Sequence, residues 1–137
     1  MKKKWSRHWG SSKQPRKQRK FVYNAPLHVR QRLVSATLDK KLRKEFGRRS
    51  MSVRKGDEVA VMRGKYAGKS GKIIRVDLKK LKIYAENIKM KKPSGAEVDA
   101  ALDASNVRLI KLNMEDVKRR KFLEKKKLHI GAEKVKK

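Results

Sequence analysis

The sequence predicts a mostly β protein: a small β-barrel with short helices and with basic extensions at both ends. Residues 53–112 contain short β-branched runs separated by glycine-rich turns, which is typical of small barrels. Only 37% of the 137 residues are hydrophobic, so we expect a core in this central part alone. The formal net charge is +29, from 42 Lys and Arg against 13 Asp and Glu. Such self-repulsion favours a polyanionic partner, with nucleic acid ahead of an anionic membrane surface.

Composition divides the chain into four segments. Residues 1–24 form a basic extension, and residues 25–52 form a short-helix segment that packs on the barrel and on the partner. Residues 53–112 form the barrel, and residues 113–137 form a basic helix and a tail. The first 38 residues carry eleven Lys or Arg and no carboxylate. We therefore expect residues 1–24 to become ordered only when a partner supplies the opposite charge.

Short helices are expected ahead of the barrel. Pro15 can start a helix through Arg16–Tyr23, since proline suits the first helical turn. Pro26 stops it, because the residue before a proline avoids the helical region. Leu27–Val34 can form one or two further turns.

A third helix is expected between Asp39 and Gly47. Asp39 can accept hydrogen bonds from the first free N–H groups, and Gly47 can adopt the left-handed closing conformation. Leu38, Leu42 and Phe46 are spaced by four and give this helix one apolar stripe.

Four strands are expected in the barrel, at Glu58–Met62, Lys72–Asp77, Leu81–Glu86 and Asn106–Ile110. In the third strand, Leu81, Ile83 and Ala85 should point inward, and Lys82, Tyr84 and Glu86 outward. The second strand does not alternate cleanly, so we expect either a bulge near Gly71 or burial on both faces. Residues 77–80 should form a turn and residues 91–95 a loop.

The last helix is expected over Asn113–Lys127. Asn113 and Asp116 resemble a capping box at its start. Its main apolar residues are Phe122 and Leu123, so it should dock weakly or lie on the partner. Beyond Leu128 the chain is expected to be a basic tail.

A glycine- and lysine-rich stretch at residues 53–76 carries the functional signal. Its glycines are Gly56, Gly64, Gly68 and Gly71, which can turn the chain, adopt positive φ or admit a close backbone approach. Its cations Arg63, Lys65, Lys69 and Lys72 can neutralise phosphates that the glycine-rich backbone lets come near. The alternative is a hairpin loop made basic by the bias of the whole chain. The spacing does not match a Walker loop.

This stretch resembles the KOW motif of ribosomal proteins and transcription elongation factors, which lies on SH3-like barrels. The flanking sequences resemble the twenty-four family of large-subunit ribosomal proteins, whose eukaryotic members are numbered twenty-six. They read APLHVR at 25–30, SATL at 35–38, LRKEF at 42–46, RSMSVRKGD at 49–57 and LDASNVR at 102–108. SKQPRKQRK at 12–20 resembles the archaeal form, whereas the extension with Trp5 and Trp9 departs from the family pattern.

The resemblance implies a structural protein of the cytoplasmic ribosome. It would bind the 5′ domain of large-subunit rRNA beside neighbouring large-subunit proteins, near the polypeptide exit tunnel, and start subunit assembly. His28 can stack on a base, touch a phosphate or simply lie at the surface. The residues expected to contact RNA are Lys13, Arg16, Lys17, Arg19, Lys20, His28, Arg30, Arg32, Arg48, Arg49, Arg63, Lys65, Tyr66, Lys69 and Lys72.

Other functional classes find little support in the sequence. The three histidines are scattered and cysteine is absent, so neither a metal site nor a cofactor is expected. Asp57 and Glu58 are adjacent in a strand and should face opposite sides, so they do not form a catalytic pair. No membrane span, secretory signal or homo-oligomer is expected. A KOW-type transcription module or a nucleoid-coating protein is the alternative function.

Overall fold

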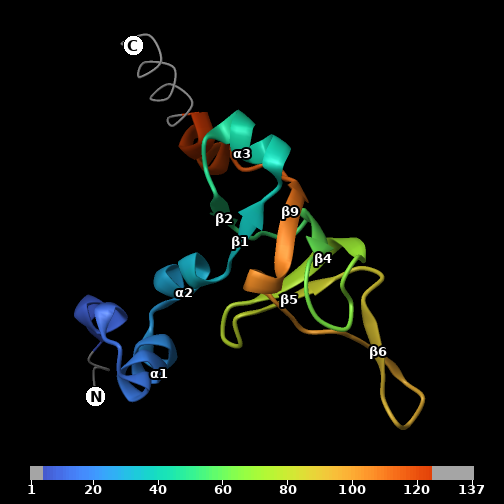
Figure 1. The fold of residues 1–137 in the computed structure, drawn as a ribbon, viewed down its shortest axis with the longest axis horizontal. Helices are drawn as coiled ribbons and strands as arrows, with labels where there is room; N and C mark the ends of the chain where they lie inside the picture. Colours follow the sequence, from blue (N-terminus) through green and yellow to red (C-terminus); the bar gives the residue numbers. More distant parts are fainter. Residues whose placement is uncertain (1–4, 125–137) are drawn as a thin grey trace.

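The computed structural model describes residues 5–124, which form a twisted sheet with short helices around it (Figure 1). Residues 117–124 are helical. The other helices are η1 (Arg7–Ser11), α1 (Pro15–Asn24), α2 (Leu27–Leu33), α3 (Lys40–Phe46) and η2 (Ala104–Asn106). The first strands are β1 (Ser35–Leu38), β2 (Ser50–Ser52), β3 (Glu58–Val61), β4 (Ser70–Asp77) and β5 (Lys82–Ala85). The later ones are β6 (Lys89–Lys91), β7 (Glu97–Asp99), β8 (Leu102–Asp103) and β9 (Val107–Lys111).

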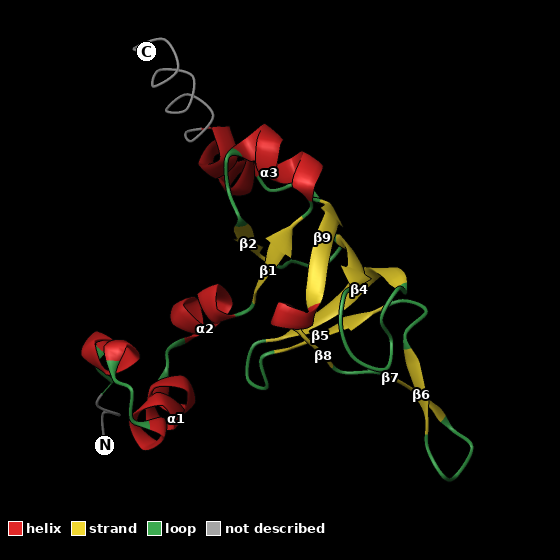
Figure 2. Ribbon diagram, viewed as in Figure 1, coloured by secondary structure: helices red, strands yellow, loops and turns green. Residues whose placement is uncertain are grey.

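The body of the molecule is a seven-stranded sheet in the order β2-β1-β9-β3-β4-β5-β8 (Figure 2). The mostly β class is therefore confirmed. The sheet does not close into a barrel through any strand pairing of the described residues. β9 pairs with β3 on one side and, in parallel, with β1 on the other, so β2 and β8 become the edge strands, and they do not pair with each other. β1 and β2 were not expected from the sequence.

The core lies against one side of this sheet. Val59 and Val61 of β3 are buried as their alternation predicts, and Val107 and Leu109 of β9 are buried beside them. Residues of the β1 region and of the 117–124 helix complete the same cluster. Burial of aliphatic side chains is worth about 1.5–3 kcal/mol each, so this cluster is the main source of stability.

The helices ahead of the sheet begin and end where local signals predict. α1 has Pro15 in its first turn, and α2 begins directly after Pro26. At α3, Asp39 accepts a hydrogen bond from the backbone N–H of Lys41, and Gly47 closes the helix at φ 58°.

Two details of the central strands differ from the expectation. The irregularity in β4 lies between Ile73 and Arg75, not near Gly71, and it turns Ile74 outward. Tyr84 was expected to point outward and lies outside the core cluster, but it is only 9% exposed because the guanidinium of Arg75, its cross-strand partner, lies 4.3 Å from its ring centroid. A cation over an aromatic face covers the ring and favours this placement.

Residues 86–100 hold a two-stranded ribbon that the sequence did not predict. β6 pairs with β7, with Met90 opposite Val98, and the expected loop at residues 91–95 is its turn. Figure 1 shows that this ribbon projects away from the sheet.

The C-terminal helix differs most from its expectation. It begins at residue 117 rather than at Asn113, because Asp116 accepts a hydrogen bond from the backbone N–H of Lys118 and caps it. It also does not dock weakly. Leu123 is 1% exposed within the core cluster, and Arg119 is 3% exposed. The described part of the chain therefore ends in an integral element of the fold, and the tail expected beyond Leu128 lies outside the described residues.

Arg119 is buried because it meets Asp57, which is fully buried at the start of β3. The Arg119 Nη1 and Nη2 atoms donate to the two carboxylate oxygens of Asp57 at 2.6 and 2.8 Å. The backbone N–H groups of Arg54 and Asn113 donate to the same two oxygens at 2.9 and 2.8 Å. Both charges are thus paired, as burial requires.

None of the helices within residues 5–124 is long and apolar enough to cross a membrane.

Candidate nucleic-acid interface

The N-terminal cations lie on and before a helix that stands apart from the sheet. Lys13, Arg16, Lys17, Arg19 and Lys20 are all exposed on this segment, and α1 contains no acidic residue. None of the α1 residues is buried, so the helix adds little to the core. The arrangement presents one positive surface to a polyanion.

The side chains of Trp5 and Trp9 pack against this helix. The Trp5 indole N–H donates to the Phe21 carbonyl at 3.2 Å, and the two ring centroids lie 5.3 Å apart. The Lys20 ammonium lies 4.7 Å from the centroid of Trp9. In the described structure, both rings therefore pack against α1.

The glycine-rich loop joins β3 to β4 and carries cations on a tight backbone. Gly64 and Gly68 have φ of 92° and 84°, and a Cβ at either would meet no atom within 4 Å. Their role is thus conformational, because L side chains rarely adopt such φ values. The Gly68 N–H donates to the Val61 carbonyl at 2.9 Å and closes the loop.

The side chains of this loop divide between solvent and core. Arg63, Lys65 and Lys69 are exposed, whereas Tyr66 is half-buried and packs against the core cluster. The Lys69 ammonium lies 5.9 Å from the Tyr66 ring centroid. The loop therefore offers three cations around one anchored ring.

Gly71 lies on β4 beside the backbone of Glu86. A Cβ there would overlap the Glu86 carbonyl oxygen, so this glycine permits two backbone segments of the protein to approach each other closely. Lys72 is exposed but lines a different hollow, which also contains the carboxylates of Glu86 and Glu115. The structure thus separates Lys72 from the loop cations.

Arg30 is occupied within the protein. Its Nε donates to the Ala25 carbonyl at 3.0 Å and its Nη2 to the Tyr23 carbonyl at 2.6 Å. Its Nη1 donates to the Lys79 carbonyl, in the turn between β4 and β5, at 3.0 Å. Arg30 therefore ties α1, α2 and the sheet together.

Three of the expected contacts meet in one pocket of about 550 Å³ between α2, β2 and the C-terminal helix. They are His28, Arg32 and Arg48. Arg49, next along the chain, is exposed and does not line the pocket. The pocket also contains Arg54 and Lys118, which sequence reasoning did not single out. Arg54 lies within the RSMSVRKGD stretch, and Lys118 within the basic helix, so only their positions in these motifs could have pointed to them.

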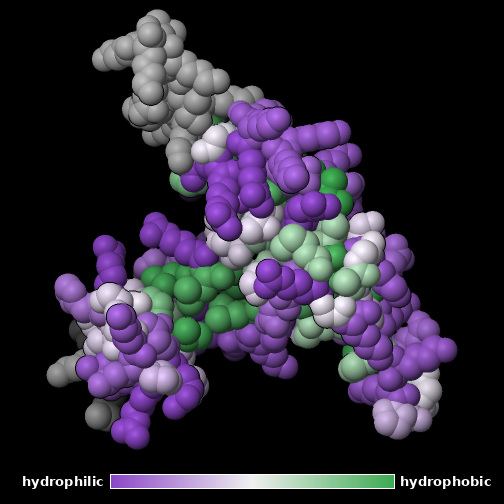
Figure 3. Space-filling model, in the orientation of Figure 1, coloured by the Kyte–Doolittle hydropathy of each residue, from purple (hydrophilic) through white to green (hydrophobic). Residues whose placement is uncertain are grey.

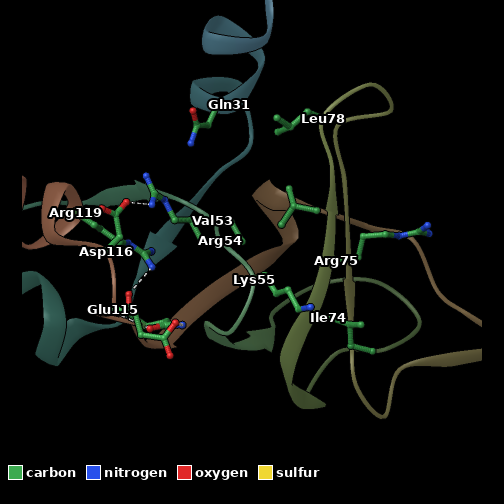
Figure 4. Close-up of a pocket in the computed structure, with 12 residues that line it drawn as sticks. Gln31, Val53, Arg54, Lys55, Ile74, Arg75, Leu78, Glu115, Asp116 and Arg119 are labelled. Carbon is green, nitrogen blue, oxygen red and sulfur yellow. Dashed lines mark hydrogen bonds and ion pairs between the residues drawn. The ribbon is translucent and has the colours of Figure 1, made fainter.

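A larger hollow of about 840 Å³ lies between β4 and the start of the C-terminal helix (Figure 4). It contains both charges: Arg54 forms an ion pair with Asp116, and Glu115 is nearby. The backbone hydrogen bond from Lys118 and the contact with Arg54 hold the pKa of Asp116 below its ordinary value of 3.8. This mixed character makes the hollow a poorer anion site than the smaller pocket.

On the face shown in Figure 3, one apolar patch lies over α2. Tyr23 of α1 and Leu27 and Leu33 of α2 are exposed. Within the described residues, no group of three or more His, Cys, Asp or Glu side chains could hold a metal ion.

Comparisons with known proteins converge on one family. The model of the family of eukaryotic L26 and archaeal L24 ribosomal proteins matches residues 12–126. "Large ribosomal subunit protein uL24" of Haloarcula marismortui is 50% identical over 113 residues, which cover 82% of this chain and 94% of that protein. The protein of the same name from Haloquadratum walsbyi is 49% identical over 113 residues, covering 82% and 95%.

Proposed function

The chain belongs to the family of eukaryotic L26 and archaeal L24 ribosomal proteins, and we propose that it is a structural constituent of the large ribosomal subunit. The family is structural rather than enzymatic. The observation that carries the proposal is a near-complete match to relatives named as large-subunit proteins, together with a net charge of +29. A protein with this charge is suited to sit among RNA phosphates.

We further propose that it binds the 5′ domain of large-subunit rRNA, near the polypeptide exit tunnel of the cytoplasmic ribosome, and starts subunit assembly. The resemblance to the family supports this placement. The exposed cations of α1 and of the β3–β4 loop support RNA contact, since phosphate contacts by Lys and Arg dominate such affinity. In this proposal, residues 1–24 become ordered on the RNA, and the protein also contacts neighbouring large-subunit ribosomal proteins.

Residues 53–112 are proposed to be a KOW domain related to SH3-like barrels. The positive φ of Gly56, Gly64 and Gly68, and the cationic loop between β3 and β4, support this assignment. The sheet departs from a closed barrel at its edge strands β2 and β8, which do not pair with each other.

Sedimentation tests the proposed function. A tagged full-length chain expressed in a related archaeon should migrate with the large subunit and stay bound in high salt. Recovery with RNA polymerase or chromosomal DNA instead would favour the transcription or nucleoid alternative and overturn the proposal.

A salt titration separates shape recognition from charge alone. Changing Lys2–Lys4 to Gln should weaken all RNAs alike and flatten the salt dependence, whose slope is about −0.7 to −0.9 per phosphate neutralised. Changing the loop should weaken the 5′ rRNA domain more than an unrelated duplex, because a structured loop reads RNA shape. Equal losses on both RNAs would show that the loop supplies only charge. The loop residues changed together are Arg63, Lys65, Tyr66 and Lys69.

A further inference from the structure

The pocket between α2, β2 and the C-terminal helix has the composition of an anion site. No Asp or Glu is among the described residues that line it. Two of its cations, Arg54 and Arg119, are already paired with carboxylates outside it. Within residues 5–124, no carboxylate forms an ion pair with Arg32, Arg48 or Lys118. Three cations that have no ion pair within the described part of the chain thus line one cavity, which favours an anionic occupant.

Two arginines of the pocket carry buried donors that nothing in the described chain accepts. The Nε–H groups of Arg48 and Arg119 are buried and have no hydrogen-bond partner among residues 5–124. Arg119 itself is 3% exposed, so its Nε cannot turn to bulk water. A buried charged donor left unsatisfied is destabilising, and an acceptor entering the pocket would relieve this.

The orientation of the Arg48 guanidinium is fixed before any ligand binds. Its guanidinium carbon lies 3.6 Å from the centroid of the Phe122 ring, which holds the flat group against the C-terminal helix. Phe122 is half exposed, so this ring forms a wall of the pocket rather than part of the core. A planar guanidinium held in one orientation can donate two parallel hydrogen bonds to a phosphate.

We propose that this pocket binds a single backbone phosphate of RNA, with Arg48 recognising its geometry and Arg32 and Lys118 adding charge. The proposal rests on the proposed function, because it takes RNA as the partner. The site joins α2, the end of α3 and the C-terminal helix, so one phosphate would link three segments that are distant in sequence. It differs from the α1 cations, which are exposed; one of them, Arg19, lines a separate hollow between α1 and α2.

The test compares two arginine-to-lysine variants that keep the charge. Arg48→Lys removes the planar fork, whereas Arg120→Lys makes the same change on an exposed residue of the C-terminal helix outside the pocket. With a transcript of the large-subunit rRNA 5′ domain, Arg48→Lys should weaken binding about 5- to 10-fold at an unchanged salt slope. Arg120→Lys should stay within about twofold.

Phosphate-ethylation interference then locates the contact. Wild-type protein should reject transcripts ethylated at one particular phosphate, and Arg48→Lys should no longer discriminate against them, while Arg120→Lys still does. Identical interference patterns for the two variants would overturn the proposal. If the wild type shows no preference for the 5′ domain over an unrelated duplex, the proposed function itself fails instead.

A second pair of variants controls for a folding defect, which Arg48→Lys could cause because Arg48 also packs on Phe122. Arg32 is exposed at the pocket, so Arg32→Gln should keep the wild-type unfolding temperature. It should reduce interference at the same phosphate, and Arg120→Gln should not. If the two variants behave alike, the pocket does not hold that phosphate.

Discussion

Replacing Asp57 by Asn probes the attachment of the C-terminal helix to the sheet. The carboxylate is fully buried and accepts four hydrogen bonds, two of them from the guanidinium of Arg119. An Asn side chain offers only one oxygen, so its NH₂ group would face donors. The buried guanidinium of Arg119 would also lose its opposite charge.

The expected magnitude follows from this geometry. Removing one partner of a buried ion pair lowers the free energy of unfolding by about 3–5 kcal/mol, because an uncompensated charge stays buried. A domain of this size has a free energy of unfolding of about 5–15 kcal/mol. With a urea m-value of about 2 kcal/mol per molar, the midpoint of Asp57→Asn should fall by about 2 M.

The assay is urea unfolding followed by far-ultraviolet circular dichroism. Tryptophan fluorescence would report on residues 5–24, where Trp5 and Trp9 lie, and not on the sheet. Asp116→Asn is the matched control, because its pair with Arg54 is about one third exposed and screened by solvent. Its urea midpoint should therefore fall by only a small fraction of the shift expected for Asp57→Asn.

A double variant checks the cause. Adding Arg119→Met to Asp57→Asn removes the uncompensated charge and should restore more than half of the lost stability. A loss below about 1 kcal/mol for Asp57→Asn alone, or no recovery in the double variant, would refute the reasoning.

The remaining predictions concern the close backbone approach, the helix cap and the N-terminal segment. Gly71→Ala should lower the free energy of unfolding by about 1–3 kcal/mol in the same assay, because its Cβ overlaps the Glu86 carbonyl. Gly64→Ala, whose Cβ meets no atom, should lower it by about 1 kcal/mol through its φ alone. Equal losses for the two variants would contradict the steric explanation. The lowered pKa of Asp116 stabilises the fold above pH 3.8, and this contribution is lost as pH falls through the folded-state pKa. Between about pH 5 and 3 the wild type should therefore lose more of its urea midpoint than Asp116→Asn, and parallel curves would refute this. Amide exchange of the free protein should be fast over residues 5–24, where α1 buries no residue, and slow within 57–111; equal protection without RNA would show that the segment folds alone.

Local signals predicted the local elements well. The Asp39–Gly47 helix carries its own cap and its own left-handed terminator, so its bounds could be read from neighbouring residues. β1 could not be read this way, because SATL is held as a strand by parallel pairing with β9, about 70 residues later. The low exposure of Tyr84 could not be predicted, because it depends on Arg75 from another strand.

The candidate site shows the same division. The exposed loop cations could be predicted from the sequence, because the glycines that shape the loop lie within a few residues of them. Arg30 looked like any other arginine of the basic segment, but its three donor atoms meet carbonyls, one of them 49 residues away. The pocket with Arg48 was not predicted as a unit, since its walls come from segments that only the fold brings together.

The position of β9 in the sheet also sets the order in which the chain can fold. β9 is the last strand within residues 5–124, but it lies between β1 and β3. Neither half of the sheet therefore gains its central neighbour until residue 111 has been synthesised. Pairings across such long sequence separations are slow to form, because the loop-closure entropy is lost before the contacts are gained. A chain ending at residue 105 should therefore show no cooperative unfolding transition. The nascent chain would accordingly carry many unneutralised cations without a completed sheet until residue 111 has emerged from the ribosome.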